Sequence, residues 1–446
     1  MKEYDVIVLG GGTAGAMAAI AAARGGARTL VVEQYGHLGG TAVYGIPFLG
    51  ILSGDGTRVN RGMVTELLDR LCREGFCFGV ADGAYWRTPE KPDSYGFNLT
   101  PFDPEGLKYV LQEMVLEAGA EILYHTMLSS VRVRDGRVCA VEVCYGSGRE
   151  WISAKQFIDC SGDASLIYQA GGRFLKKEQL QNSSILFHLG QVDLDAFRDA
   201  LERGDRVLGK NSWHTRIVEG SKTPGAKPTL VHMAGHLLPF ENDREVTFTA
   251  VSYRDGEVYL NATRTAGIDG SDVIQMSRGE IEERRHVMEI YRAMKQRVPG
   301  FSRATLLHTS PLGIRESRNI LGKYVIRRED VLEGRSFADG VARGAYPIDI
   351  HDPKGGRTQF QFIKNGGSYE IPLRAMIPEG LDGVLAAGRC ISAEHEAVGT
   401  VRIMGCVLSQ GEAAGTAAAW CVRDRCEPRE LDGAALKRKL QIDLEG

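Results

Sequence analysis

The sequence predicts an α/β fold whose main domain is assembled from three separate parts of the chain. A short apolar strand, a glycine-rich turn and a helix open the chain, which is how a parallel sheet begins. From about Ser184 to Ile371 the pattern changes to more charge and more strand-like alternation, around a long helix over residues 271–297. A buried strand and a small-residue helix return near the end. These observations predict a discontinuous Rossmann-like domain with an inserted mixed α+β domain.

The opening segment has the complete pattern of a dinucleotide-binding unit. Tyr4–Leu9 is a buried apolar strand, and Gly10-Gly11-Gly12-Thr13-Ala14-Gly15 follows at once and matches G-x-G-x-x-G. An alanine-rich helix over residues 16–24 and a second strand over residues 28–33 complete the unit, and that strand ends in Glu33. A glycine motif alone is weak evidence, but this sequence context makes dinucleotide binding a specific prediction.

Each part of this unit has a chemical reason. Gly10 permits the tight turn, Gly12 lets the backbone approach a pyrophosphate, and Gly15 lets the helix pack closely on the strand. The N-terminus of the helix supplies N–H groups and a positive dipole end for phosphate. Glu33 is placed to accept hydrogen bonds from the ribose hydroxyls.

The rest of the chain alternates between helices and strands, with few long loops. We expect an irregular junction over residues 82–101, which are rich in Gly, Pro, Tyr and Trp. A hairpin turn is expected at Asp135-Gly136. The expected helices cover residues 61–72, 104–117, 271–297 and 405–423, and the expected strands cover residues 121–125, 128–134, 138–145, 155–159 and 383–387.

Composition narrows the classes of function. The chain has 446 residues, which predicts two or three domains, with 43% hydrophobic and 25% charged residues, as in a soluble globular protein. A net charge of -3 provides no basic surface for nucleic acid or for anionic lipid. We therefore expect a small-molecule substrate and no nucleic-acid or membrane partner. The composition leaves the oligomeric state open, including a homo-oligomer.

The uncharged run over residues 6–23 imitates a signal peptide, but two features argue against one. Glu3 and Asp5 occupy the part that should be positive, and Gly10-Gly11-Gly12 interrupts the apolar run. Nine cysteines without framework spacing fit a reducing compartment better than a disulfide scaffold. The expectation is a cytoplasmic protein.

Several blocks spread over nearly the whole chain carry a family resemblance. They are G-G-T (39–41), F-D-P-E-G-L-K (102–108), I-D-C-S-G-D-A (158–164), G-I-R-E-S-R (313–318), Y-E-I-P-L-R (369–374), L-A-A-G-R-C-I-S-A-E-H-E-A-V-G-T-V-R (385–402) and G-E-A-A-G-T-A-A-A (411–419). With them the chain resembles the FAD-dependent oxidoreductases of glutathione-reductase-like fold, in the wider group that includes fumarate reductase flavoproteins. The resemblance implies FAD as the cofactor.

The resemblance also implies domain boundaries. Residues 1–50, 100–183 and 372–446 would form the FAD-binding domain, and residues 184–371 the inserted substrate domain. Residues 51–99 would form a helical and irregular junction between them.

The expected FAD-binding residues lie in five short segments. Gly388-Arg389 stands where the wider group often has Gly-Asp, so Arg389 would contact the FAD differently, as a cation against the diphosphate. Gly399-Thr400-Val401-Arg402 is expected to open the last helix, whose dipole end would face the N1–C2=O edge of the flavin and stabilise its reduced anion. The remaining expected FAD contacts are Gly10, Gly12, Thr13, Ala14, Gly15, Glu33, Gln34, Gly39, Gly40, Thr41, Ser161, Gly162 and Asp163.

Three residues are candidates for catalysis. His395 lies in the segment leading to the flavin edge and could accept a hydroxyl proton while a hydride leaves for flavin N5, or it could be a supporting or solvent-exposed histidine. Arg315, with its neighbour Arg318, could clamp a carboxylate or polarise a carbonyl, or both could form salt bridges with Glu316 or between the domains. Arg402 is the third candidate, because its segment is placed beside the flavin.

Other reactive groups are assigned structural roles. Cys72 and Cys77 have the C-x4-C spacing of disulfide-reductase flavoproteins but lie far from the double glycine, so both are expected to pack as small hydrophobic residues. Cys390 and Cys406 are also expected to pack. No His, Cys, Asp or Glu cluster has the spacing of a metal site.

The predicted activity is hydride transfer between a carbon of a small organic molecule and flavin N5. A second G-x-G-x-x-G motif is missing, so the electron partner is expected to be oxygen, a quinone, another protein or the substrate itself. Two alternatives stay open. One is a fumarate-reductase-like reductase of an activated double bond, with Arg315 or Arg402 donating the proton. The other is a non-catalytic nucleotide-binding protein.

Overall fold

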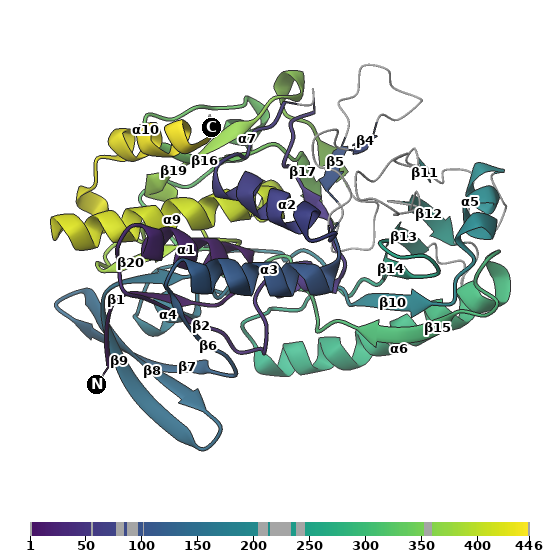
Figure 1. The fold of residues 1–446 in the computed structure, drawn as a ribbon, viewed down its shortest axis with the longest axis horizontal. Coiled ribbons are helices and arrows are strands. Elements are labelled where there is room, and N and C mark those ends of the chain that lie inside the picture. The colour runs from purple at the N-terminus through teal and green to yellow at the C-terminus, as the bar shows by residue number, and fades with distance from the viewer. Residues whose placement is uncertain are drawn as a thin grey trace.

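The computed structural model describes residues 2–54, 57–76, 84–86, 97–100, 102–203, 213–214, 233–237, 246–351 and 359–444. Its largest sheet joins strands from the beginning, the middle and the end of the chain (Figure 1). The strand order is β6-β2-β1-β9-β8-β7, and β20 also pairs with β9. The bounds are β1 (Lys2–Leu9), β2 (Thr29–Val32), β6 (Glu121–Leu123), β7 (Met127–Arg134), β8 (Arg137–Tyr145), β9 (Gly148–Asp159) and β20 (Val384–Ala386).

The strands at the centre of this sheet are parallel. β1 pairs in parallel with β2 and with β9, so that Leu9 lies beside both Val32 and Asp159. β20 pairs in parallel with β9, which sets Ala386 beside Asp159 although the two residues are distant in sequence. The carboxyl ends of these strands therefore meet at one edge, which is where open α/β sheets bind ligands. The predicted α/β fold, with its discontinuous Rossmann-like domain, is confirmed.

An antiparallel hairpin extends the sheet. β7 and β8 pair through the turn at Asp135 and Gly136, whose φ values are 51° and 75°. Positive φ at both central residues is the backbone that an Asp-Gly hairpin turn favours, so the predicted turn is found.

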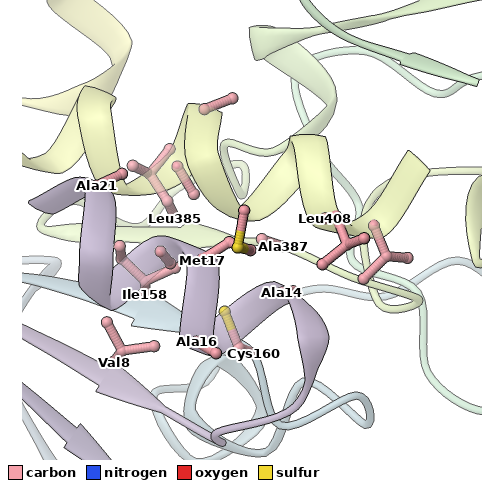
Figure 2. Packing of buried hydrophobic residues seen from close by; sticks show 14 of the residues in the cluster. Val8, Ala14, Ala16, Met17, Ala21, Ile158, Cys160, Leu385, Ala387 and Leu408 are labelled. Carbon is pink, nitrogen blue, oxygen red and sulfur yellow. The ribbon is translucent and has the colours of Figure 1, made fainter. Parts of the chain in front are cut away.

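Two helices of small residues cover one face of the parallel strands. α1 (Thr13–Arg24) crosses α9 (Met404–Asp424) at close range, because a Cβ at Gly411 would lie 2.2 Å from the carbonyl oxygen of Ala14. A Cβ at Gly415 would lie equally close to the carbonyl oxygen of Ala18. Figure 2 shows side chains of the two helices packed with those of the strands beneath them, including Met17, Leu408, Val8, Ile158 and Leu385.

A second sheet with its own core lies to one side of the first (Figure 1). Its strand order is β11-β12-β13-β14-β10-β15 and its pairings are antiparallel. Val287, Ile290 and Met294 of the long helix α6 share that core with Phe187. The bounds are β10 (Leu186–Gly190), β11 (Trp213–His214), β12 (Met233–Leu237), β13 (Val246–Val251), β14 (Val258–Asn261), β15 (Thr305–Thr309) and α6 (Val273–Arg297). This is the inserted mixed α+β part.

The remaining elements surround these two sheets. The start of α3 follows the sequence prediction, because Asp103 is its N-cap and accepts a hydrogen bond from the N–H of Glu105 at 2.9 Å. The further elements are β3 (Phe48–Leu49), α2 (Met63–Arg73), α3 (Pro104–Glu117), α4 (Ser165–Gln169), α5 (Leu194–Glu202), α7 (Arg328–Leu332), β16 (Gly340–Gly344), β17 (Ile348–Ile350), β18 (Gln359–Gln361), β19 (Tyr369–Pro372), α8 (His395–Val401), α10 (Gly433–Leu444) and the 3-10 helices η1 (Gly40–Tyr44), η4 (Lys364–Gly366), η5 (Leu373–Ala375) and η6 (Pro428–Glu430).

The segment expected to be irregular, residues 82–101, contains two short strands, β4 (Ala84–Trp86) and β5 (Phe97–Thr100), which pair with each other. Its other residues lie outside those that the structure describes. Within the described part of the chain, no helix combines the length and the apolar character needed to span a membrane.

Candidate functional site

The glycine-rich turn lies at the carboxyl edge of the parallel strands, between β1 and α1. Gly10 has a φ of 93°, and a Cβ there would lie 2.5 Å from the carbonyl oxygen of Cys160. A Cβ at Gly15 would lie 1.8 Å from the carbonyl oxygen of Gly10. At Gly12 the nearest atom to a Cβ position is the Cα of Gly40 at 4.0 Å. The turn is thus closed around Gly10 and Gly15 and open at Gly12, which fits a backbone cradle for a diphosphate.

Glu33 follows β2 and binds back to this turn. One carboxylate oxygen accepts the N–H of Gly11 at 2.6 Å, and the other accepts the N–H of Tyr35 at 2.7 Å. Burial raises the pKa of Glu33, while the hydrogen bonds from the backbone oppose that shift. Gln34 is exposed beside it. The acid therefore lies beside the glycine turn, where the sequence placed it, and it also holds the shape of the turn.

The double glycine lies against the same turn. Gly39 donates its N–H to the carbonyl oxygen of Gly11 at 2.9 Å and forms a parallel bridge with Gly12. Gly39 and Gly40 have φ values of 100° and 54°, which side chains rarely adopt. Thr41 continues into η1. The glycine turn and the double glycine are 24 positions apart in sequence, counted from Gly15 to Gly39, and yet they share one backbone surface.

A third segment, Ser161-Gly162-Asp163, follows β9 at this edge. The hydroxyl of Ser161 donates to the carboxylate of the fully buried Asp159 at 2.6 Å. Arg389 forms an ion pair with Asp163, and a Cβ at Gly162 would lie 2.9 Å from the Cζ of Arg389. The arginine that replaces the acid of the wider group is therefore partnered by an acid of its own. Its buried Nε has no hydrogen-bond partner among the described residues.

Two amide side chains fasten these segments together, and the sequence reasoning missed both. Gln410 accepts the N–H of Gly388 at 2.8 Å and donates to the carbonyl oxygen of Val401 at 2.7 Å. Asn319 donates to the carbonyl oxygens of Arg389 and Ile391, each at 2.7 Å. A buried amide in a helix of small apolar residues was the signal that could have pointed to Gln410.

The position of the segment Gly399–Arg402 in the structure differs from the sequence prediction. It does not open the last helix: Gly399, Thr400 and Val401 end the short helix α8, and Arg402 is the C-cap. The long helix α9 begins at Met404, because Ile403 has an extended backbone with ψ of 138°. The N–H groups of Gly399 to Val401 are therefore used inside α8 and do not form a free helix N-terminus.

Thr400 and Gly399 instead anchor α8 to its neighbours. The hydroxyl of Thr400 lies 2.9 Å from the hydroxyl of Tyr369, and a Cβ at Gly399 would lie 3.0 Å from the carbonyl oxygen of Asp349. This close approach of α8 to β17 brings Asp349 next to the segment that carries Arg402.

His395 is the first residue of α8, and its partner comes from a distant segment. Its Nδ1 lies 2.8 Å from a carboxylate oxygen of Glu316, whose side chain is fully buried. The other carboxylate oxygen of Glu316 lies 2.6 Å from Nζ of Lys177. Although burial opposes the shift, the ion pair with His395 and the charge of Lys177 lower the pKa of Glu316. The carboxylate of Glu316 raises the pKa of His395.

Because Glu316 is paired in this way, it does not form the salt bridge with Arg315 or Arg318 that the sequence left open. Glu316 contacts His395 and Lys177, not Arg315 or Arg318. Arg318 instead stacks on the ring of Tyr168, with its Cζ 3.8 Å from the ring centre. Arg315 donates to the carbonyl oxygen of Asn182 at 2.6 Å. Only Arg315 of the two arginines lies near the other candidates.

Arg402 and Arg315, both half-buried, belong to one group of charges with the buried Asp349. Arg402 donates weakly to the side-chain oxygen of Gln181 at 3.3 Å and to the carbonyl oxygen of Asp349 at 3.4 Å. Burial, followed by the positive charges of Arg402 and Arg264, lowers the pKa of Arg315 to about 9. Burial likewise lowers the pKa of Arg402, and Asp349 opposes that shift.

Three members of this group were missed by the sequence reasoning: Arg264, Asp349 and His351. Asp349 lies 3.4 Å from Nε2 of His351. Despite burial, His351, Arg402 and Arg315 together lower the pKa of Asp349 to about 2. Burial, followed by the charge of Arg315, lowers the pKa of His351 to about 4. No local motif marks these residues, because they come from unrelated segments.

The cysteines that the structure describes are all free thiols. Cys390 and Cys406 are buried, and burial raises the pKa of both thiols, that of Cys406 to about 11. Cys72 is half-buried in α2, and Cys77 lies outside the described residues. Within the described ranges, no three His, Cys, Asp or Glu side chains are grouped so that they could hold a metal ion.

Comparison with known proteins assigns this chain to a family. A family model described as FAD dependent oxidoreductase matches residues 5–440, nearly the whole chain. A curated relative, thiamine thiazole synthase from Aeropyrum pernix, is 34% identical over 139 residues. That match covers 31% of this chain and 43% of the relative, so it spans less than half of either protein.

Solved structures give more distant likenesses. A geranylgeranyl bacteriochlorophyll reductase-like protein from Thermoplasma acidophilum aligns with 100% of this chain and 92% of its own, at 13% identity and a TM-score of 0.48. A p-nitrophenol 4-monooxygenase from Pseudomonas putida aligns with 100% of this chain and 87% of its own, at 13% identity and a TM-score of 0.49. The assignment of this chain therefore depends on the family match.

Proposed function

The chain belongs to the FAD-dependent oxidoreductase family, and we propose that it transfers a hydride between a carbon atom of a small organic substrate and N5 of the flavin. Membership makes the chain an FAD-dependent enzyme, which removes the non-catalytic alternative. When bound, FAD supplies the hydride acceptor or donor. The substrate and the direction of the reaction belong to the proposal.

The glycine cradle is the proposed binding site for the FAD diphosphate. Gly12 and the first residues of α1, Thr13 and Ala14, would approach the phosphates, since the space beside Gly12 is open. The carboxylate of Glu33 accepts hydrogen bonds from the N–H groups of Gly11 and Tyr35 and has further lone pairs. These lone pairs would accept hydrogen bonds from the ribose hydroxyls of the adenosine. Arg389 would place its unpartnered Nε near the diphosphate. Gly39, Gly40, Thr41, Ser161, Gly162, Asp163 and Gly388 would complete the cradle.

His395 is the proposed proton acceptor. Its contact with Glu316 through Nδ1, at 2.8 Å, is the single observation that carries the mechanism. When Nδ1 donates its proton to this buried carboxylate, Nε2 keeps a lone pair that can accept the substrate hydroxyl proton as the hydride departs. Glu316 then stabilises the imidazolium, and Lys177 keeps Glu316 ionised. The side chain of His395 is 28% exposed, so a substrate can reach it.

An anaerobic reduction experiment tests this proposal. Purified FAD-loaded protein is mixed with primary and secondary alcohols, 2-hydroxy acids and amines, and bleaching of the flavin absorption bands is followed in a stopped-flow spectrometer. Bleaching by a hydroxyl or amine donor, and its loss in His395→Asn, is the expected result. A flavin that dithionite reduces but that no such donor reduces would contradict hydride transfer to the flavin with His395 as the proton acceptor.

A double-bond reductase is the second candidate, and one observation favours it. Burial and the charges of Arg402 and Arg264 lower the pKa of Arg315 to about 9, which is the direction that favours release of a proton. The direction of electron flow separates the two candidates. A reductase would reoxidise dithionite-reduced flavin with an unsaturated acid under anaerobic conditions and would leave the flavin oxidised with alcohols.

A further inference from the structure

The end of α9 is closed by a backbone motif that brings two cysteines together. Arg425 has a left-handed backbone with φ of 54°, and its N–H donates to the carbonyl oxygen of Cys421. The N–H of Cys426 donates to the same oxygen at 3.1 Å. This second bond is the one that defines a Schellman motif, in which the side chains at the two bonded positions commonly contact each other. Here those positions are Cys421 and Cys426.

The two thiols contact each other and differ in exposure. They are joined by a side-chain hydrogen bond. Cys421 is 1% exposed, whereas Cys426 is half-buried. Burial, followed by the charge and the hydrogen bond of Cys426, raises the pKa of Cys421, and Arg137 opposes this shift. Cys421 therefore keeps its proton, and Cys426 is the thiol that a reagent in solvent meets first.

The segment that carries Cys426 is fixed against the large sheet. The carbonyl oxygen of Cys426 accepts a hydrogen bond from Nε2 of Gln156 in β9 at 3.3 Å. The next residue, Glu427, accepts the N–H of Gly383 at 2.8 Å and forms an ion pair with Arg137. These contacts keep the segment in place beside α9, so the meeting of the two thiols does not depend on a free loop.

Other described thiols have different surroundings. Cys160, Cys390 and Cys406 are buried, so a reagent in solvent does not reach them directly. Cys139 is half-buried, but its thiol donates to the carbonyl oxygen of Arg137 at 3.3 Å. The end of α9 therefore combines two features that thiol oxidation needs, which are a reachable sulfur atom and a second thiol in contact with it.

We propose that Cys421 and Cys426 form a reversible disulfide site, with hydrogen peroxide as the oxidant. A disulfide requires two residues that lie close together with their side chains directed toward each other, and the Schellman motif provides both. A flavin that passes its electrons to oxygen releases this oxidant. The site itself does not depend on the proposed hydride transfer, because peroxide from any source would serve.

The oxidation takes place in two steps that balance. The sulfur of Cys426 attacks one oxygen of the peroxide, the O–O bond breaks, and the leaving hydroxide takes up the thiol proton as water. Cys426 is then a sulfenic acid. The sulfur of Cys421 attacks this sulfur, the S–O bond breaks, and a second hydroxide leaves with the proton of Cys421 as water. Two thiols lose two electrons in total, and the peroxide is reduced to two water molecules.

The disulfide site lies away from the proposed cofactor site. Glu427 binds Gly383, just before β20 begins at Val384, whereas Gly388-Arg389 follows the other end of that strand. The glycine cradle lies at the carboxyl edge of the same sheet, so the two sites are at opposite edges. Oxidation of Cys421 and Cys426 should therefore leave the FAD content unchanged.

Peptide mapping tests the proposal directly. The FAD-loaded protein is treated with hydrogen peroxide, its free thiols are blocked with N-ethylmaleimide, and it is digested with trypsin for mass spectrometry. Trypsin cleaves after Arg423 and Arg425, so only a disulfide keeps peptides 403–423 and 426–429 together. The linked pair is expected after peroxide and should be lost on treatment with dithiothreitol. Recovery of Cys426 as a blocked free thiol, or as a sulfinic acid without a linked partner, would overturn the proposal.

Substitutions assign the linked sulfur atoms. Peptide 403–423 also contains Cys406, so Cys421→Ala must abolish the link, and a link that survives in this variant would show that the proposal is wrong. Cys426→Ser changes a half-buried position and keeps the test clear if Cys421→Ala folds poorly. It should abolish the link and leave Cys421 reduced. Cys144→Ser removes another half-buried thiol and is the matched control that should keep the link.

Thermal unfolding supplies an independent measurement. A disulfide that forms without moving the end of α9 restricts the unfolded chain, so the oxidised protein should melt at a higher temperature than the reduced protein. Dithiothreitol should reverse this increase, and Cys426→Ser should not show it. An unchanged or lower melting temperature of the linked protein would mean that the bond forms only when the end of α9 opens, which would contradict a site built by the folded chain.

Discussion

The glycine cradle and the charged cluster are built in opposite ways, the cluster being Arg264, Arg315, Arg402, Asp349 and His351. The cradle consists of backbone from Gly10 to Gly15 and the double glycine, and its shape depends on missing side chains. The cluster consists of long charged side chains from several segments, held by burial and by a few long hydrogen bonds. A backbone cradle is uncharged and fixed by sterics, so it fails when atoms are added. A charged cluster is limited by solvation, so it responds to changes in charge and pH.

The largest expected effect is steric and belongs to the cradle. In Gly15→Ala the added methyl group would lie 1.8 Å from the carbonyl oxygen of Gly10, so the turn must shift, at a cost of about 1 to 3 kcal/mol. The purified variant is expected to carry less than about a tenth of the wild-type FAD, as measured by the ratio of flavin to protein absorbance. Gly367→Ala, where φ is -79° and a Cβ would lie 3.4 Å from the carbonyl oxygen of Lys364, is the control and should keep its FAD. A Gly15→Ala protein with full FAD content would show that the cradle is not the diphosphate site.

The next largest effect concerns His395, which connects the two regions. His395→Asn is expected to slow flavin reduction by a hydroxyl donor roughly 10²- to 10⁴-fold, because the proton acceptor is lost. In the wild-type protein the neutral imidazole accepts the proton, so the rate should rise with pH through a midpoint above the ordinary pKa of histidine. Stopped-flow pH profiles measure both quantities.

Glu316→Gln sharpens this prediction, because it changes a pKa without removing the imidazole. The midpoint of the pH profile should move to lower pH, since the carboxylate that raises the pKa of His395 is gone. A purely structural role for Glu316 would lower the rate and leave the midpoint in place. His188→Asn is the matched control, because His188 also faces a carboxylate, that of Glu257 at 3.0 Å, and should leave the midpoint unchanged.

The smallest expected effect is the response of the cluster to acid. Burial and the charge of Arg315 lower the pKa of His351 to about 4, so the folded protein holds it neutral where the unfolded chain protonates it. Protons then bind preferentially to the unfolded state as the pH falls from about 7 toward 4, and stability decreases over that window. The loss between pH 7 and pH 5 should be about 1 to 2 kcal/mol, measured by urea unfolding at each pH.

His351→Asn should remove that share of the acid sensitivity, since the titrating ring is absent. His125→Asn replaces an exposed histidine with a positive φ of 52°, which asparagine tolerates, and should keep the wild-type dependence. If both variants lost stability with acid equally, the sensitivity would come from another group, and the lowered pKa of His351 would be contradicted.

The sequence by itself was sufficient for the cradle and for the fold around it. Gly10, Gly15 and Glu33 lie within 24 residues and act through local backbone geometry, so their spacing alone specifies a strand, a turn and a helix start. The capped start of α3 at Asp103 and the hairpin turn at Asp135-Gly136 were predicted for the same reason. The error at Gly399–Arg402 arose where a break at Ile403 separates two helices that the pattern of small residues joins.

The contacts among the charged side chains were decided only by the tertiary structure. His395 was a candidate from the sequence, but its partner Glu316 lies 79 positions away and was expected beside arginines instead. Arg264, Asp349 and His351 carry no local sequence signal. They act on one another only because the fold brings the second sheet and α8 together. Local spacing encodes backbone conformation, whereas the energy of a buried charge depends on every group around it. That sum exists only in the folded chain.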